Sequence, residues 1–360
     1  MSVTDALSEL REAGLLRELR SVESASGPRV VLDGRDVLLL CSNDYLGLAG
    51  DPRVRAAAAE AALEWGAGAG SSRLVSGSLP PHDALEADLA AYQGTEACLL
   101  FGSGYLANLG VITALTGPGE VVLSDALNHA SIVDACRLSR ADVTVYRHLD
   151  LEDLECGLRG AEGRRATVVT DAVFSMDGDV AELEAIRSLA RAYDARLIVD
   201  AAHATGVVAP FAGADVVVGT LSKALGSYGA FACCDEATRA LLINRARTVI
   251  YSTALPPAAV GAARAALALV DERIGALHAN ARVLRGALGA AVSDMPIVPL
   301  VFGDPHAALA ASERALAAGV FAQAIRPPTV PDGTSRLRLV ARADHDGAEL
   351  AAAGALLAAL

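Results

Sequence analysis

Lys223 lies between an apolar run and a glycine-containing turn in the segment TLSKALGSYG, residues 220–229. Lysine side chains normally remain in water. Beside a buried strand, the amine either reaches solvent along its aliphatic stem or is held in place for chemistry. The residues that follow the other predicted strands decide between these two interpretations.

Small and polar residues follow five predicted strands of the chain. Ligands of open α/β sheets bind beyond the carboxyl ends of the strands. Each of these residues alone has a structural explanation, such as a helix cap, a turn or a hydrogen-bonded buried histidine. Together they indicate a ligand. In chain order they are Ser103, Gly104 and Tyr105; His129; Ser175, Asp177 and Asp179; Asp200 and His203; and Thr220, Ser222 and Lys223.

A cofactor with a phosphate, an aldehyde and a basic ring nitrogen suits this set. The helix N-terminus that begins at Ser103 suits the phosphate, and the Lys223 amine can condense with the aldehyde. A buried Asp200 keeps the ring nitrogen protonated, which makes the ring an electron sink. His129 can stack on the ring, and His203 can bond its phenolic oxygen. We therefore predict a pyridoxal 5′-phosphate (PLP) site in which Lys223 forms the Schiff base.

Two other interpretations remain open. Residues 102–107 follow a strand and open a helix, which matches a relaxed dinucleotide fingerprint, with Asp125 about 20 residues further on. A nicotinamide-dependent oxidoreductase would, however, leave Asp200, His203 and Lys223 without a role. A catalytically dead scaffold would not need all three of these residues either.

Strands and helices that alternate between about residues 85 and 250 must position these residues. Short β-branched runs that are apolar on both faces are typical of buried parallel strands. Amphipathic helices lie between them, for example over 180–194. The pattern predicts an α/β fold with a large, mainly parallel, doubly wound sheet. The expected strands are residues 97–101, 120–125, 142–148, 166–176, 195–202, 214–220 and 230–234.

The pattern changes towards the C-terminus. Residues 254–288 predict one long helical stretch after a Pro-Pro break, and residues 297–303 and 335–343 predict strands of a smaller sheet. Chain length also favours one large domain and one smaller one. We expect an N-terminal segment with a helix and short strands at 1–45, a large PLP-binding α/β domain at 46–255, and a small α+β C-terminal domain at 256–360.

Composition excludes several classes of protein. The 360 residues carry a net charge of −13, which argues against nucleic acid as the main partner. No apolar run approaches the roughly 18 residues of a membrane span, and the N-terminus lacks a signal core. We expect no membrane association and a cytoplasmic protein. The six cysteines include no C-x-x-C pair, so we expect no metal and scattered buried thiols.

Longer motifs carry a family resemblance that spans nearly the whole chain. They are SNDYLGL (42–48), GAGAGSSRLVSG (66–77), NHASIVDACRLSRA (128–141), FSMDGD (174–179), VDAAHATG (199–206), TLSKALGSYGA (220–230), YSTALPPA (251–258) and RPPTVPDGTSRLRL (326–339). In these motifs the chain resembles the α-oxoamine synthases, a branch of the fold-type I PLP enzymes. The resemblance implies that fold, with PLP as cofactor.

The resemblance also implies an activity. The chain resembles most the acyltransferases of biotin biosynthesis, which condense L-alanine with pimeloyl-CoA or a pimeloyl carrier protein. Their products are 8-amino-7-oxononanoate, CO₂ and CoA or the free carrier protein. The phrase RPPTVPDGTSRLR favours them over 2-amino-3-ketobutyrate CoA ligase, which uses glycine and acetyl-CoA and stays the alternative. Acyl-chain length and the choice between CoA and carrier protein stay open.

The resemblance assigns further roles around the cofactor. The amides of Gly104 and Tyr105, with Thr220, would hold the phosphate, and Ser175 would orient the ring. Ser252 and Thr253 would reach the phosphate of a neighbouring subunit. This implies a homodimer with shared active sites.

It also assigns roles towards the substrates. Asn43 and Arg338 would hold the carboxylate of the amino acid, because a guanidinium fork matches a carboxylate in two hydrogen bonds. Arg17, expected in the N-terminal helix, would meet the distal carboxylate of the pimeloyl chain; its alternative is a solvated helix face. Arg336 shares the strand face of Arg338, and we expect one of the two to be a surface charge.

Three other positions receive structural interpretations. Asp177 and Asp179 are expected to cap a helix at residues 180–193. His82, in PPHDALE, is expected to lie beside a helix cap. The ending LRLVARADHD departs from the alanine-histidine-threonine pattern usual in the family, so no role is assigned to His345.

Overall fold

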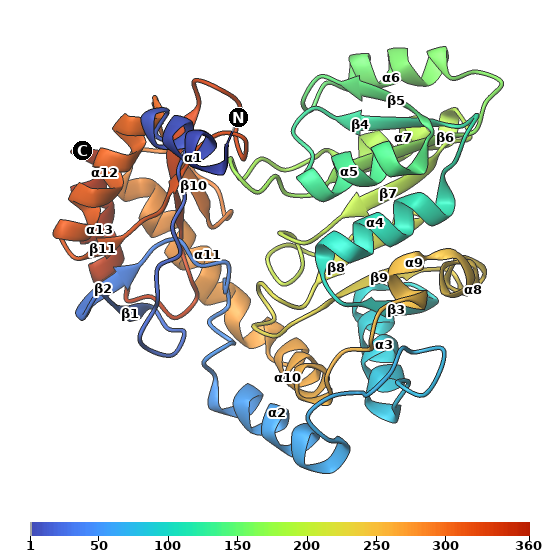
Figure 1. Cartoon of the computed structure of the whole chain (residues 1–360), viewed down its shortest axis with the longest axis horizontal. Helices are drawn as coiled ribbons and strands as arrows, with labels where there is room; N and C mark the ends of the chain where they lie inside the picture. Colours follow the sequence, from blue (N-terminus) through green and yellow to red (C-terminus); the bar gives the residue numbers. More distant parts are fainter. Residues whose placement is uncertain (1) are drawn as a thin grey trace. The chain divides into compact units, whose positions relative to one another are not determined.

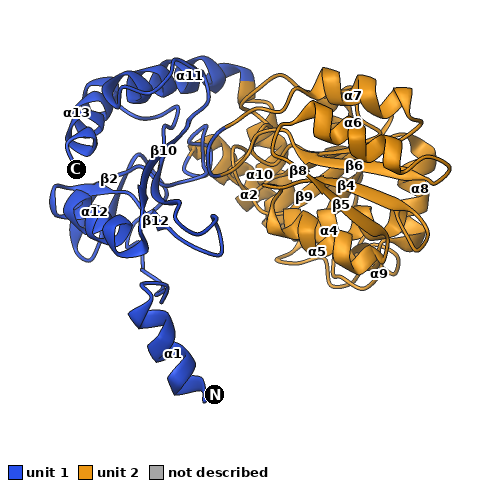
Figure 2. Cartoon of the chain, turned by 90° about the horizontal axis from the view of Figure 1, so that it is seen from above, with its two compact units in different colours: residues 1–50, 176–178, 271–360 blue, residues 51–175, 179–270 orange. Residues whose placement is uncertain are grey.

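The computed structural model describes residues 2–360, and the chain forms two compact units (Figure 2). Unit 1 consists of residues 1–50, 176–178 and 271–360. Unit 2 consists of residues 51–175 and 179–270. The two stretches of unit 2 are thus separated in sequence by three residues that belong to unit 1.

Unit 2 alternates strands with helices (Figure 1). Its elements are α2 (Pro52–Trp65), α3 (Pro80–Gln93), β3 (Ala97–Phe101), α4 (Gly104–Leu115), β4 (Val121–Asp125), α5 (Ala130–Ser139), β5 (Asp142–Tyr146), α6 (Leu151–Gly160), β6 (Ala166–Asp171), α7 (Leu183–Ala192), β7 (Arg196–Asp200), β8 (Val216–Thr220), β9 (Ala230–Cys234), α8 (Glu236–Arg245), α9 (Arg247–Ile250) and α10 (Pro257–Leu267).

The seven strands of unit 2 form one sheet in the order β3-β9-β8-β7-β6-β4-β5. β4 to β8 pair in parallel, whereas β9 is antiparallel to both β3 and β8. The prediction of a mainly parallel sheet is confirmed, and the parallel interpretation of 230–234 was wrong. β5 also departs from the expectation: it is an edge strand, and four of its five residues are exposed.

Helices cover both faces of this sheet. In Figure 2, α6 and α7 lie on one face and α4 and α5 on the other. α4 and α5 bury an apolar core against the strands, built from residues such as Val111, Ile132 and Ile198. Burial on both faces explains the continuous β-branched runs of the central strands.

Unit 1 holds the N-terminal segment and the C-terminal part of the chain. Its elements are α1 (Val3–Glu12), β1 (Arg29–Leu32), β2 (Arg35–Leu39), α11 (Val270–Ala287), β10 (Ile297–Gly303), α12 (Pro305–Ala317), β11 (Val320–Phe321), β12 (Ala324–Ile325), β13 (Ser335–Val340) and α13 (Gly347–Ala358). They form two three-stranded sheets, β1-β2-β11 and β10-β13-β12.

The core of unit 1 joins α11, α12 and α13 to these sheets, with Leu284, Ala311, Leu339 and Leu350 fully buried. The expected single helix over 254–288 is in fact two helices, because α10 ends at Leu267 and α11 begins at Val270. The division between the two units falls directly after Val270.

Candidate active site

The predicted strand ends meet at one edge of the sheet in unit 2. β3, β4, β6, β7 and β8 all run in the same direction, because β9 reverses between β3 and β8. Their carboxyl ends therefore carry the predicted ligand-binding residues along a common edge.

Lys223 follows β8 in a turn, and its amine contacts a histidine. The Nζ atom lies 2.8 Å from Nε2 of His203, which is 6% exposed and follows β7. A hydrogen bond between an ammonium and an imidazolium is impossible because both groups only donate. At least one of the two groups is therefore neutral, which makes this pair suited to accepting a proton.

Asp200 ends β7 and is 3% exposed. Its Oδ1 accepts a hydrogen bond from the amide of Ala202 (2.8 Å), and its Oδ2 accepts one from Nδ2 of Asn108 (2.6 Å). Asn108 Nδ2 also donates to Ser131 Oγ (2.9 Å), which in turn lies 2.7 Å from Nδ1 of His129. A chain of hydrogen bonds thus links the buried carboxylate to the histidine.

His129 is the N-cap residue of α5, where its Nδ1 accepts a hydrogen bond from the amide of Ser131. Desolvation lowers the pKa of His129, and the positive charge of Lys223 lowers it further against the opposing effect of Asp200. A neutral ring is the form that suits stacking on a cationic heterocycle. We name Lys223, His203, Asp200, Asn108 and His129 the lysine cluster.

Asp171 is a member of this region that the sequence did not reveal. It ends β6, pairs in register with Asp200, and accepts a hydrogen bond from the amide of His129 (2.9 Å). Burial raises the pKa of Asp171 well above its ordinary value, and the neighbouring Asp200 raises it further. A protonated Asp171 adds no second negative charge beside Asp200. Asn108 was also missed, although a lone amide in the apolar helix YLANLGVITAL is a detectable signal.

The predicted phosphate turn lies at the start of α4. Ser103 caps the helix, and its Oγ accepts a hydrogen bond from the amide of Leu106. A Cβ atom placed on Gly104 would lie 3.9 Å from Cβ of Thr220, so this turn lies beside the end of β8. Thr220 Oγ1 bonds Gly229 O at 3.0 Å. The side chain of Tyr105 instead donates to Asp134, which leaves the backbone amide as the part of Tyr105 suited to an anion.

The structure places three further predicted residues of unit 2 in loops. Ser175 is half-buried, next to a turn in which the amide of Phe174 bonds Asp179 O. Ser252 and Thr253 belong to a different segment, which pairs with the glycine-rich region through a bridge between Thr253 and Ser72.

Arg338 and Asn43 meet in unit 1, as expected from the carboxylate site. Arg338 is 5% exposed and donates from Nη1 to Asn43 Oδ1 (2.8 Å). Its Nη2 donates to the hydroxyl of Tyr45 (3.1 Å), a contact that the sequence did not reveal. Asp44, which lies between Asn43 and Tyr45 in the sequence, forms an ion pair with Arg342 (3.2 Å). We name Asn43, Asp44, Tyr45, Arg338 and Arg342 the arginine cluster.

Some expectations in unit 1 were wrong. Arg336 is not a surface charge: it is 5% exposed and forms an ion pair with Asp177. Arg17 does not lie in a helix, because α1 ends at Glu12. The exposed Arg17 instead donates from Nη2 to Pro327 O at 2.8 Å and to Arg326 O at 3.3 Å.

The expected caps of α7 were also wrong. Glu182 is its N-cap residue and makes no side-chain cap. Asp177 pairs with Arg336, and Asp179 lies 3.4 Å from His148. The carboxylates are used for other contacts because α7 starts later than the sequence pattern suggests.

The interpretation of His82 is confirmed: its Nδ1 accepts a hydrogen bond from the N-cap amide of Leu79, and its Nε2 lies 2.8 Å from Leu255 O. Asp125, the candidate for a dinucleotide ribose, binds His148 (2.9 Å) and the amide of Leu149 (2.9 Å). These contacts explain Asp125 without a nucleotide.

Cysteines and metals were also addressed by the sequence. All six cysteines are free thiols; four are buried, whereas Cys41 is half-buried and Cys156 is exposed. Among residues 2–360 no group of His, Cys, Asp and Glu side chains is arranged to hold a metal ion. Over the same residues no helix has the length and apolarity that a membrane crossing requires.

The lysine cluster fits the chemistry of PLP. It offers an amine hydrogen-bonded to a histidine, a buried carboxylate for the ring nitrogen, and a helix N-terminus beside Thr220 for the phosphate. Asn108 Oδ1, next to this carboxylate, is buried and finds no partner within the described residues. Lys223 is also the only lysine in the sequence.

Comparisons with known proteins agree with this geometry. The model of the aminotransferase class I and II family matches residues 35–355. The 8-amino-7-oxononanoate synthase of Anaeromyxobacter dehalogenans is 50% identical over 98% of this chain and 94% of its own length. That of Geobacter sulfurreducens is 49% identical over 99% of this chain and 97% of its own.

Solved structures show the same fold. The serine palmitoyltransferase of Sphingomonas wittichii superposes with a TM-score of 0.93 at 30% identity, covering 99% of this chain and 97% of that one. The 8-amino-7-oxononanoate synthase of Francisella tularensis superposes with a TM-score of 0.76 at 24% identity, covering 90% and 97%. A lysine-to-alanine variant of the serine palmitoyltransferase of S. paucimobilis, at 30% identity and TM-score 0.92 over 99% of this chain and 98% of that one, contains a bound PLP–myriocin aldimine.

The chain belongs to the aminotransferase class I and II family and, within it, to the family of its 8-amino-7-oxononanoate synthase relatives. The predicted resemblance and fold class are thereby confirmed. PLP is the cofactor of this fold, and the enzyme is a PLP-dependent acyltransferase.

Proposed function

We propose that this enzyme condenses L-alanine with a pimeloyl thioester and releases CO₂ and the free thiol, giving 8-amino-7-oxononanoate for biotin synthesis. The contact between Lys223 Nζ and His203 Nε2, next to the buried Asp200, carries the proposal. The identity of about half to synthases of this name supports the choice of substrates. Pimeloyl-CoA and a pimeloyl carrier protein are the two candidate donors, and the cytoplasm is the proposed location.

PLP, when bound, accepts the electron pair left on the α-carbon of the amino acid. Lys223 Nζ would hold the cofactor aldehyde, and the same amine is the group placed to take the proton from the α-carbon of the amino acid and to return one later. The hydrogen bond between Lys223 Nζ and His203 Nε2 requires that the two groups are not both protonated, which leaves the pair able to receive that proton. The carboxylate of Asp200 stabilises positive charge on the ring nitrogen.

The remaining residues of unit 2 orient the cofactor. His129, which is held by Ser131 and Asp171, would stack on the ring. The turn from Ser103 to Tyr105 and the hydroxyl of Thr220 bind the phosphate, and Ser175 orients the ring. Ser252 and Thr253 complete the phosphate site of a second subunit, so the active form is a homodimer.

The arginine cluster binds the other end of the amino acid. Arg338, with Asn43, holds the carboxylate that leaves as CO₂ after the new carbon–carbon bond has formed. Arg17, on the carbonyls of Arg326 and Pro327, binds the distal carboxylate of the pimeloyl chain.

A substrate matrix tests the proposal. The purified, PLP-loaded enzyme is assayed with L-alanine, glycine or L-serine against pimeloyl-CoA, a pimeloyl carrier protein and acetyl-CoA, with release of the thiol as the signal. Turnover is expected with L-alanine and a pimeloyl donor. Preference for glycine with acetyl-CoA would instead identify a ligase of 2-amino-3-ketobutyrate, and preference for L-serine would exclude both.

A further inference from the structure

The segment SNDYLGL, residues 42–48, carries two contacts to Arg338 but has no helix or strand of its own. One backbone hydrogen bond attaches it to the residues that follow β13: Ala343 N donates to Tyr45 O at 2.8 Å. Just before the segment, Val340 N donates to Leu40 O, also at 2.8 Å. These bonds hold the backbone, and other contacts set the directions of the side chains within the segment.

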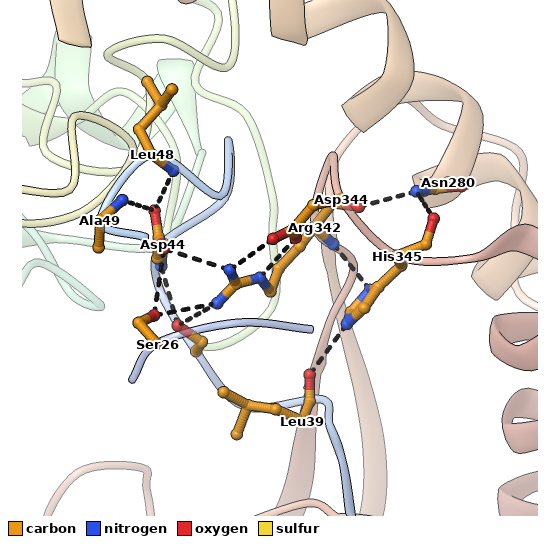
Figure 3. Close-up of polar contacts among 10 residues, drawn as sticks. Ser26, Leu39, Asp44, Leu48, Ala49, Asn280, Arg342, Asp344 and His345 are labelled. Atoms are coloured by element: carbon orange, nitrogen blue, oxygen red, sulfur yellow. Dashed lines mark hydrogen bonds and ion pairs between the residues drawn. The ribbon is translucent and has the colours of Figure 1, made fainter. Parts of the chain in front are cut away.

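Arg342 supplies these contacts from a fully buried position, with 0% of its surface exposed. Figure 3 shows its guanidinium between two carboxylates. Nε and Nη2 donate to the two oxygens of Asp344 at 2.8 and 2.9 Å, and Nη2 also lies 3.2 Å from Asp44 Oδ2. Nη1 donates to Ser26 Oγ and Ser42 Oγ, each at 3.4 Å.

Asp44 transmits this contact to the backbone. Its Oδ1 accepts hydrogen bonds from the amides of Leu48 (2.9 Å) and Ala49 (3.3 Å), so the carboxylate closes the turn that follows it (Figure 3). Burial raises the pKa of Asp44, and the charge of Arg342 opposes that rise. Arg342 therefore favours the ionised form of Asp44 and holds its carboxylate in place.

The backbone of Arg342 is itself held rigidly. Its amide donates to His345 Nδ1 (3.0 Å), and the opposite nitrogen of His345 lies 3.1 Å from Leu39 O (Figure 3). Asn280 Nδ2 donates to the carbonyls of Arg342 (2.8 Å) and His345 (2.9 Å). The guanidinium thus projects from a fixed base.

Stability alone does not explain this arrangement. A buried ion pair is often no more stabilising than apolar side chains of similar volume. What it does fix is geometry. Asp44 stands directly between Asn43 and Tyr45, the two residues that bond the two Nη atoms of Arg338.

We propose that Arg342 is a positioning residue for the amino acid carboxylate: by holding Asp44, it sets Asn43 and Tyr45 and thereby the orientation of Arg338. The inference deepens the proposed function and rests on the carboxylate role given there to Arg338. Arg342 does not touch the substrate.

The test compares Arg342→Met with a matched control, Arg285→Met, in the PLP-loaded enzyme. Arg285 is also a buried arginine of unit 1, but it bonds the carbonyls of Met295 and Ile297. The absorbance of the cofactor is titrated with L-alanine and with L-alaninamide, which lacks the carboxylate. Arg342→Met is expected to weaken L-alanine binding about 10-fold, as loosened support of a binding group does, and to leave L-alaninamide binding within about twofold.

A double-mutant cycle separates positioning from general damage. In an Arg338→Ala background, Arg342→Met should cost little further L-alanine affinity. Arg342→Lys, which keeps the charge without the fork, should recover part of the loss. Equal weakening of both ligands, the same loss in Arg285→Met, or a full 10-fold loss in the Arg338→Ala background would each overturn the proposal.

Two further measurements keep the test decisive. If thermal unfolding shows that Arg342→Met does not fold, Asp44→Asn enters the same cycle with the same expectation, and Arg342→Lys enters it with a smaller loss expected. If the wild-type enzyme turns over an amino acid other than L-alanine, the proposed substrate is wrong. The cycle then runs with that amino acid and its amide, and its result still decides the role of Arg342.

Discussion

The lysine cluster of unit 2 and the arginine cluster of unit 1 differ in whether their charged groups exchange protons. The lysine cluster contains groups that can exchange a proton during the reaction, and its environment acts on them: desolvation, together with the charge of Lys223, lowers the pKa of His129 against the effect of Asp200. The arginine cluster contains two guanidinium groups that stay charged at any physiological pH. Proton transfer needs the first kind of group and carboxylate binding needs the second.

This difference predicts how each cluster fails. Damage to the lysine cluster should lower kcat, because these groups act on the reacting atoms. Damage to the arginine cluster should raise the KM for the amino acid, because those groups bind the substrate carboxylate before the chemical step begins.

The largest effect is expected at Lys223. Lys223→Ala should lower kcat by at least about 10³-fold, because it removes both the covalent anchor of the cofactor and the proton acceptor. Turnover is measured with L-alanine and a pimeloyl thioester. As the only lysine in the chain, Lys223 also allows an unambiguous chemical test.

Borohydride reduction of the wild-type holoenzyme should fix the cofactor to a single peptide that contains residue 223, as read by mass spectrometry. The Lys223→Ala protein should lose the cofactor on denaturation after the same treatment. Label on another residue, or full activity in the variant, would remove the basis of the proposed mechanism.

The sequence predicted the lysine cluster better than the arginine cluster, for a physical reason. Strands that alternate with helices bring their carboxyl ends to one edge, so order along the chain predicts proximity for Asp200 and His203. Every predicted strand of unit 2 is present, within a few residues at its ends. The reversed direction of β9 was missed because a buried antiparallel strand has the same apolar pattern as a parallel one.

The arginine cluster joins residues about 300 positions apart in the chain, and no local period predicts such a contact. Its Asn43 and Arg338 came only from the family resemblance, whereas Tyr45 and Arg342 required the structure. Arg336 was misjudged for the same reason, since its partner Asp177 also lies far away in sequence, 159 positions before it. Strand alternation placed Arg336 and Arg338 on one face but could not show that this face is covered.

The second prediction contrasts two neighbouring carboxylates. Asp200→Asn should lower kcat by about 10²-fold or more, because the ring nitrogen loses its charged partner. Asp171→Asn should cost less than about 10-fold, since burial and Asp200 raise the pKa of Asp171 and an amide resembles a protonated acid. Steady-state kinetics of both variants at saturating substrate decide the matter. Equal losses would mean that the two acids share one role.

The third prediction concerns the arginine cluster. Arg338→Ala should raise the KM for L-alanine about 10- to 100-fold, the worth of a lost charged hydrogen-bond pair. The KM for the acyl thioester should stay within about twofold in the same assay. A parallel rise in both KM values would show that Arg338 supports the fold of unit 1 and does not bind the carboxylate.

The smallest effect is expected on stability, at His345 behind the arginine cluster. Burial and, after it, the nearby charge of Arg342 lower the pKa of His345 from 6.5 to about 4, against the opposing effects of Asp344 and of the hydrogen bond to Leu39 O. Between these two pH values His345 is therefore protonated in the unfolded chain and neutral in the folded chain. The free energy of unfolding should fall as the pH drops from about 6.5 to 4, by at most about 3 kcal/mol from this residue.

His345→Gln should flatten this acid limb, because glutamine keeps an acceptor and a donor but does not titrate. Urea unfolding at several pH values between 4 and 8 measures the slope. His306→Gln, at an exposed histidine of the same unit, serves as the control and should leave the slope as it is in the wild type. If His345→Gln kept the full slope, protonation of His345 would not be what limits stability in acid. The hydrogen bonds that hold the backbone of Arg342 would then not depend on the protonation state of His345.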